Sequence, residues 1–115
     1  IVDDDPKVAR ALQRLLSKCD CQVALGGQQG LQYLGQEVPF DLILCDLMMP
    51  EVSGIEVYKK ATEAQKRRFL FVTGGVFTQE AQNFLNQVKV PLLSKPFDQG
   101  KLAAAFNKLL PSAKP

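Results

Sequence analysis

The sequence predicts an α/β protein in which a doubly wound parallel sheet of five strands, in the order 2-1-3-4-5, lies between two layers of helices. Three observations lead to this expectation. Short apolar runs alternate with helical patterns five times along the chain, as in consecutive strand–helix units. The best runs are almost continuously apolar, which is typical of strands buried on both faces of a parallel sheet. The chain has 115 residues, which fits a single domain spanning residues 1–115.

The expected strands differ in length. The run over residues 40–45 is the strongest, and the run over residues 69–72 is also nearly all apolar. The first run is only Ile1-Val2, which is shorter than a usual strand, so we expect that residues upstream of it are missing from this chain. In order, the five runs cover residues 1–2, 22–25, 40–45, 69–72 and 90–93.

Helical spacing and capping residues mark a helix after each strand. Ser53 and Glu56 form a capping-box pattern, so the third helix should begin near Gly54. Asp98 is a favourable N-cap for the last helix, which Pro111 should end. The apolar positions that define the other faces are Val8, Leu12, Leu15 and Leu16 in the first helix, Leu31 and Leu34 in the second, Ala81, Phe84, Leu85 and Val88 in the fourth, and Leu102, Ala105, Phe106 and Leu109 in the fifth.

The composition argues against several classes of protein. The formal net charge of +2 is too near neutral to indicate direct binding to nucleic acid or to a membrane surface. No apolar run is long enough to span a bilayer, and the acidic N-terminus is unlike a signal peptide. The three cysteines, Cys19, Cys21 and Cys45, occur in a chain without histidine, which disfavours a zinc site. An odd number of cysteines predicts a reducing, cytoplasmic location.

Reactive side chains stand at the ends of the expected strands. Asp3 and Asp4 follow the first strand, Asp46 the third, Thr73 the fourth and Lys95 the fifth. In open α/β sheets, ligands bind outside the carboxyl ends of the strands, where the strand order reverses. Since strands 1 and 3 are neighbours in the expected order, the three aspartates should converge there.

This set of side chains predicts a chemistry. Three carboxylates close together repel one another unless they are protonated or bind a cation, and an all-oxygen cluster favours Mg²⁺. Lys95 adds a positive charge and Thr73 a hydroxyl donor, which suits a phosphoryl group, and Asp46 is the candidate nucleophile for an aspartyl phosphate. Taken singly, each feature has an ordinary interpretation: Asp5 before Pro6 is an N-cap, and the segments after Thr73 and Lys95 are turns.

With these residues in place, the whole chain resembles the receiver domains of two-component response regulators, which have a flavodoxin-like fold. Four segments carry the resemblance, each weak alone and strong in this order and spacing. They are Val2-Asp3-Asp4-Asp5-Pro6, the D-x-x-M-P-x-x-x-G pattern from Asp46 through Pro50 to Gly54, Phe71-Val72-Thr73-Gly74-Gly75, and Ser94-Lys95-Pro96-Phe97.

The resemblance implies roles for the site residues. Asp46 would accept a phosphoryl group from the phosphohistidine of a sensor histidine kinase or a phosphotransfer domain. Asp4 and Asp46 would bind Mg²⁺ directly, Asp3 would bind it through water, and the Met48 backbone carbonyl would complete the protein ligands. The catalytic side chains beside Asp46 would be Lys95, which contacts the phosphoryl group, and Thr73, which hydrogen-bonds to it. The resemblance and the turn toward the next helix also predict a cis peptide bond between Lys95 and Pro96.

One departure from the family pattern bears on the parent protein. Many members carry an aromatic residue three positions before the lysine, where this chain has Leu92. With the abrupt N-terminus, this favours the receiver module of a hybrid sensor histidine kinase, and the alternative is a free-standing single-domain response regulator. Such a domain phosphorylates and dephosphorylates itself without being a turnover enzyme. Receivers pair in several ways, so a homodimer stays open.

Three rival functions fit the residues less well. A phosphatase of the haloacid dehalogenase type would need a second aspartate two positions after Asp46, where Met48 stands. A flavin-binding electron carrier would need a loop rich in glycine, serine and threonine after the first strand, where this chain has acids that repel phosphate. A receiver-like domain that only binds partners should lack one of the five site residues, and all five are present.

Overall fold

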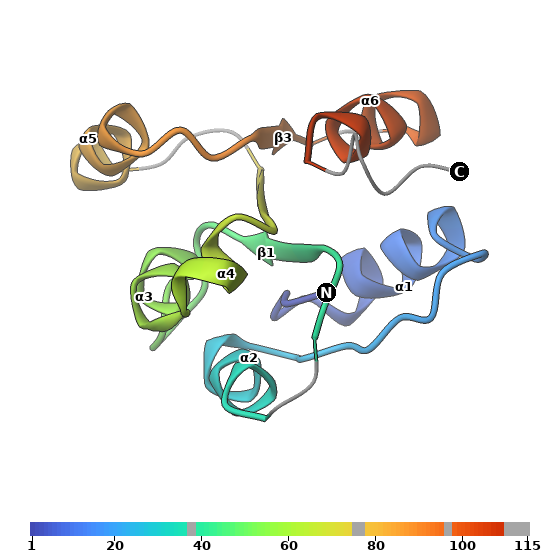
Figure 1. Ribbon diagram of the computed structural model, residues 1–115, viewed down its shortest axis with the longest axis horizontal. Helices are drawn as coiled ribbons and strands as arrows, with labels where there is room; N and C mark the ends of the chain where they lie inside the picture. Colours follow the sequence, from blue (N-terminus) through green and yellow to red (C-terminus); the bar gives the residue numbers. More distant parts are fainter. Residues whose placement is uncertain (37–38, 75–77, 96–97, 110–115) are drawn as a thin grey trace.

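The computed structural model describes residues 1–36, 39–74, 78–95 and 98–109. Within that part of the chain no helix is long and apolar enough to cross a membrane. Figure 1 shows the elements in space. In chain order they are α1 (Pro6–Leu15), α2 (Gly27–Leu34), β1 (Ile43–Asp46), α3 (Gly54–Lys60), α4 (Glu63–Lys66), β2 (Phe69–Thr73), α5 (Gln79–Gln87), β3 (Leu92–Ser94) and α6 (Gln99–Leu109).

The sheet has the predicted strand order. β1, β2 and β3 are parallel and adjacent in that sequence, with Ile43 opposite Phe69 and Phe71 opposite Leu92. Val2 extends the sheet beyond β1, because it forms parallel bridges to both Cys45 and Ala24. Reading across these pairings gives the order 2-1-3-4-5, so the predicted doubly wound fold is confirmed. The runs expected as strands at residues 1–2 and 22–25 contribute one bridging residue each, Val2 and Ala24, because only Val2 stands at the centre of the pairing.

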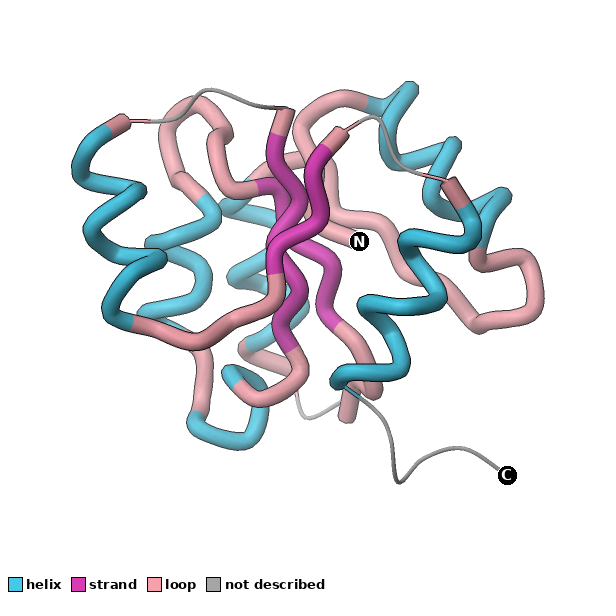
Figure 2. The backbone as a smooth tube through the Cα atoms, turned by 90° about the horizontal axis from the view of Figure 1, so that it is seen from above, coloured by secondary structure: helices cyan, strands magenta, loops and turns pink. Residues whose placement is uncertain are grey.

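Helices cover both faces of the sheet, as Figures 1 and 2 show. The alternation of side chains along the strands separates two hydrophobic clusters. The larger cluster includes Ile43 and Phe71 and packs against α2, α3 and α5, and the smaller includes Leu44 and Val72 and packs against α1 and α6. Strands β1 and β2 are therefore both buried along their whole length, as their apolar sequences predicted.

Most helix boundaries agree with the capping signals. Asp5 caps α1 by accepting a hydrogen bond from the Lys7 N–H at 2.9 Å, and Ser53 caps α3 through the Glu56 N–H at 3.3 Å. Asp98 accepts a hydrogen bond from the Lys101 N–H at 2.9 Å at the start of α6. The expected stop at Pro111 and the side chains of Phe106 and Leu109 lie outside the described residues.

The short helix α4 has no counterpart among the predicted elements. One turn of helix cannot show an apolar periodicity, and none of its residues is buried. Its signal is instead a capping box: Thr62 accepts a hydrogen bond from the Gln65 N–H at 3.1 Å, and the Gln65 side chain accepts one from the Thr62 N–H at 2.9 Å. This helix lies between α3 and β2 in the chain.

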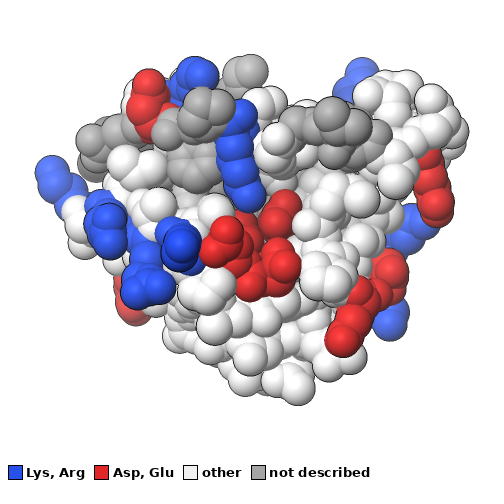
Figure 3. Space-filling view, turned by 180° about the vertical axis from the view of Figure 1, so that it is seen from behind, with Lys and Arg blue, Asp and Glu red and all other residues white. Residues whose placement is uncertain are grey.

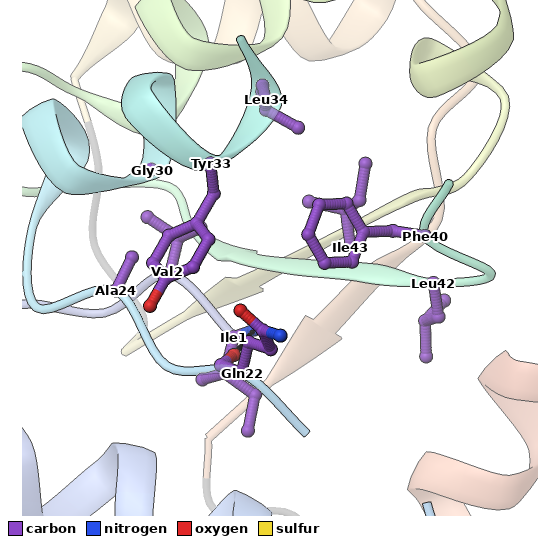
Figure 4. A pocket seen from close by; sticks show the side chains of 10 residues that line it. All are labelled: Ile1, Val2, Gln22, Ala24, Gly30, Tyr33, Leu34, Phe40, Leu42 and Ile43. Atoms are coloured by element: carbon purple, nitrogen blue, oxygen red, sulfur yellow. Dashed lines mark hydrogen bonds between the residues drawn. The ribbon is translucent and has the colours of Figure 1, made fainter. Parts of the chain in front are cut away.

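A small cavity lies between α2 and the sheet, lined by side chains that include Val2, Tyr33 and Ile43 (Figure 4). Its volume is about 30 Å³, which is room for one water molecule. Gly30 lies against its floor, where an added Cβ atom would be 2.9 Å from Val2 Cγ1. We interpret the cavity as a packing gap, too small for a ligand.

Candidate functional site

The predicted aspartates converge at the carboxyl ends of the strands. One carboxylate oxygen from each of Asp3, Asp4 and Asp46 lies within 4.8 Å of the other two. Lys95 reaches this group from the end of β3, with its Nζ atom 3.8 Å from Asp3 Oδ2. Figure 3 shows acidic side chains gathered at the centre of one face, with a basic side chain extending down to them. The sequence-based prediction that these residues meet is therefore confirmed.

Backbone hydrogen bonds set this arrangement. The Val2 N–H donates to the Leu44 carbonyl at 2.7 Å, and the Asp46 N–H donates to the Val2 carbonyl at 2.8 Å. These two bonds fix the register between residues 1–3 and β1, so Asp3, which follows Val2 directly, lies beside Asp46. The acid pair thus depends on strand pairing, which holds both carboxylates in place despite their repulsion.

Burial changes the acidity of both inner aspartates. Asp46 is only 7% exposed, and burial, followed by the neighbouring negative charge of Asp3, raises its pKa to about 6. The positive charge of Lys95 and a hydrogen bond from the Met48 N–H, at 3.4 Å, oppose this rise. Burial likewise raises the pKa of Asp3. At neutral pH the Asp46 carboxylate is mostly ionised, as a nucleophile must be.

One carboxylate oxygen of the site lacks a hydrogen-bond partner among the described residues. Asp3 is 1% exposed, and its Oδ1 atom accepts a hydrogen bond from the Asp5 N–H at 2.9 Å. Its Oδ2 atom is buried without such a bond, and Lys95 at 3.8 Å is beyond hydrogen-bonding distance. A buried anionic oxygen beside two further carboxylates fits a hard cation, because a cation or its bound water would satisfy that oxygen.

Thr73 and Lys95 stand on neighbouring strand ends. Thr73 is 2% exposed, and its carbonyl accepts a hydrogen bond from the Lys95 N–H at 2.8 Å, which ties the two ends together. Among the described residues, a Cβ atom added to Gly74 would approach only Lys95 Cδ, at 4.0 Å, so none of them crowds this side of Gly74. The predicted cis bond before Pro96 lies outside the described residues.

Two supporting features were not anticipated from the sequence. Asp5 was expected only as a helix cap, but its own N–H also holds Asp3. Gly54 was recognised as part of a motif, and its structural reason is close packing: an added Cβ atom would lie 3.0 Å from the Asp46 carbonyl carbon and closer still to its oxygen. The fixed spacing between Asp46 and Gly54 was the available signal for this contact.

Comparison with known proteins adds independent observations. The family model described as response regulator receiver domain matches residues 1–107. The response regulator receiver protein CpdR of Brucella abortus is 34% identical over 118 residues, covering 98% of this chain and 96% of that protein. The transcriptional regulatory protein DltR of Streptococcus agalactiae is 33% identical over 110 residues, covering 93% of this chain. The chain spans only 49% of the length of DltR.

Solved structures show the same fold. A response regulator receiver domain from Clostridium thermocellum has a TM-score of 0.83 at 19% identity, covering 97% of this chain and 92% of that one. The receiver domain of a Pseudomonas aeruginosa sensor histidine kinase has a TM-score of 0.81 at 21% identity, covering 96% and 94%. That protein has a magnesium ion coordinated in its active site cleft. Given the family match and the identity to CpdR, this chain belongs to the receiver domains of two-component response regulators.

Proposed function

We propose that this receiver domain accepts a phosphoryl group on Asp46 in a reaction that requires Mg²⁺. One observation carries the proposal: a buried but mostly ionised carboxylate lies beside two further carboxylates, one with a buried oxygen that accepts no hydrogen bond from the described residues, and a lysine reaches the same group. Asp3, Asp4, Asp46 and the Met48 backbone carbonyl are the proposed protein ligands of the metal. Mg²⁺ would supply charge neutralisation for the phosphoryl oxygens.

The residues of the chain have distinct parts in the proposed transfer. An Asp46 carboxylate oxygen forms a bond to phosphorus as the bond between phosphorus and the histidine nitrogen of the donor breaks, and the electron pair of that bond returns to the nitrogen. Lys95 offsets the charge on the phosphoryl oxygens, and the Thr73 hydroxyl donates a hydrogen bond to one of them. Gly74 leaves room for the incoming group.

The proposed phosphodonor is a sensor histidine kinase or a phosphotransfer domain. We also propose a cytoplasmic location and, for the parent protein, a hybrid sensor histidine kinase. The receiver domain of a sensor histidine kinase among the structural neighbours supports that origin. The coverage of 96% of CpdR favours the alternative, a free-standing regulator. The flanking sequence of the full-length gene would decide between them.

A homodimer is a further arrangement that sedimentation of the domain would test.

Phosphorylation of the purified domain tests the proposal. The domain is incubated with acetyl phosphate and Mg²⁺, and its intact mass is measured with and without a chelator. We expect the mass of one phosphoryl group to be added to the wild type only when Mg²⁺ is present, and not to be added to Asp46→Asn. Asp41→Asn, which changes an exposed aspartate just before β1, is the matched control and should behave as wild type. Equal incorporation in the wild type and Asp46→Asn would refute the assignment.

A further inference from the structure

We propose that the groove between α3, α4 and α5 is a docking site for an acidic, amphipathic helical segment of a partner protein. None of the phosphorylation-site residues lines this groove. In Figure 1, α5 lies above α3 on the same side of the sheet, with α4 in front of α3. The inference goes beyond the proposed phosphoryl transfer and is independent of it.

The groove has an apolar floor and basic side chains on one wall. Its volume is about 440 Å³, which is large enough for side chains of a docked segment. Ile55 and Tyr58 from α3 and Phe84 from α5 form much of the floor, and Lys59 and Lys66 line the wall formed by α3 and α4. This combination fits a helix that places apolar side chains in a groove and carboxylates at its edge.

The charge of this region differs from that of the rest of the chain. Residues 59–68 contain five basic residues and one acidic residue, a net charge of +4, while the whole chain carries only +2. The acidic residue, Glu63, is 3.7 Å from Lys66, and its side chain is 83% exposed while that of Lys66 is 25% exposed, so solvent around Glu63 screens this ion pair and it contributes little. A partner that brings carboxylates to this wall would meet a local excess of positive charge.

The two groove lysines are already held in position. Lys59 Nζ lies 5.9 Å from the centroid of the Phe84 ring, and Lys66 Nζ lies 5.4 Å from that of Tyr58. These cation–π contacts limit the freedom of the two side chains, which reduces the entropy lost when they bind a carboxylate. The two rings also pack edge to face with their centroids 5.5 Å apart.

The same contacts favour a protein partner over nucleic acid. Single-stranded nucleic acids bind by stacking bases on open aromatic faces, but here a lysine lies over a face of each ring. The opposite wall, on α5, carries the amides of Asn83 and Gln87 and the acid Glu80. Glu80 would repel phosphates on that wall, whereas amides can hydrogen-bond to a peptide. The acidic side chains of the partner should therefore face α3 and α4.

Binding to a defined probe tests the inference. The probe is a fluorescein-labelled helical peptide of about 15 residues, with glutamates on one face and leucines on the other. Fluorescence anisotropy is measured with the full chain, and amide chemical shifts locate the binding site. We expect shifts on α3, α4 and α5 and a roughly tenfold loss of affinity in the double variant Lys59→Glu with Lys66→Glu. The affinity should also fall as the salt concentration rises.

Matched controls separate docking from general charge attraction. The double variant Arg14→Glu with Lys18→Glu makes the same change of charge at and beyond the end of α1, where both residues are exposed, and should retain binding within about twofold. Shift mapping uses the unmodified chain, so it remains informative if a variant folds poorly. Equal losses in the two double variants, or shifts located away from the groove, would overturn the inference. The inference would also be overturned if single-stranded RNA or phosphatidylserine vesicles bound more tightly than the peptide and the Lys59 and Lys66 changes abolished that binding.

Discussion

The acidic edge of the sheet, formed by Asp3, Asp4 and Asp46, and the basic segment over residues 59–68 differ in how far their charges are buried. At the acidic edge, Asp3 and Asp46 are buried, and strand pairing fixes their positions. In the basic segment, Lys59 is exposed and Lys66 partly so, and both are supported by aromatic rings. Buried like charges raise pKa values and favour a bound cation, which suits chemistry. Charges at the surface keep access to solvent and suit recognition of a partner.

The largest expected effect is on the rate of phosphorylation, when one lysine in each of the two regions is replaced by glutamine. Lys95→Gln removes the positive charge that reaches the acidic cluster, so the rate of phosphorylation by acetyl phosphate should fall about 100-fold, because the phosphoryl oxygens lose an electrostatic partner. Lys59→Gln, in the basic segment, should leave that rate unchanged. Time courses of intact mass provide the measurement. A similar rate in Lys95→Gln and wild type would show that the acidic edge does not use this lysine.

The start of α3 offers the next test, because this helix begins beside the acidic edge and ends in the basic segment. In Gly54→Ala the added methyl group would collide with the Asp46 backbone, so we expect a loss of about 3 kcal/mol in the free energy of unfolding. Gly35→Ala is the matched control: the nearest atom of the described residues to its methyl group would be the Leu31 carbonyl oxygen, at 3.4 Å, and the change should be within about 0.5 kcal/mol. Urea denaturation measures both. Equal stabilities would contradict the close packing.

In the absence of metal, the free energy of unfolding of the domain should depend on pH through the acidic edge. The pKa of Asp46 is raised from 3.8 to about 6 on folding, so between these values the folded state binds more protons than the unfolded state. The free energy of unfolding should therefore fall as pH rises through this window and stay lower above it. Without metal at pH 7, Asp46→Asn should be more stable than wild type by on the order of 2 kcal/mol.

Two controls sharpen this measurement. Mg²⁺ should raise the stability of wild type above pH 6 more than that of Asp46→Asn, because it binds the ionised carboxylates. Asp41→Asn, at an exposed position, should follow the wild-type pH profile. A wild-type profile that rises between pH 4 and 6 relative to Asp46→Asn would contradict the raised pKa.

The smallest expected effect concerns Leu92. This residue lies on β3, opposite Phe71, and is 40% exposed. Leucine has no ring to move into space near Thr73, so phosphorylation should shift the surface of α5, β3 and α6 only modestly. Larger amide shifts are expected in the loops after β1 and β2, residues 47–53 and 74–78, of which 75–77 lie outside the described residues. Spectra with and without beryllofluoride test this. Large shifts concentrated on Leu92 and α6 would refute it.

Local patterns in the sequence were sufficient for the architecture. The alternation of apolar runs and helical spacing predicted the strands and helices, because the period of buried side chains follows directly from backbone geometry, and the right-handed connections of doubly wound folds then gave the strand order. The placement of Asp3, Asp46, Thr73 and Lys95 at strand ends followed from the same alternation, since parallel strands carry their last residues to one edge. Helix α4 escaped this reasoning because a single turn has no periodicity, and its capping box was the signal to use.

The sequence by itself determined which residues meet at the carboxyl edge of the sheet, and only the tertiary structure decided the state in which they meet. The raised pKa of Asp46, the Asp3 oxygen that accepts no hydrogen bond from the described residues, and the lysines over the rings of Tyr58 and Phe84 all depend on how the chain is folded. Burial and electrostatic interaction depend on separation in space and on access to water. A linear pattern records the order of side chains and their faces, and the distances arise only when the layers pack.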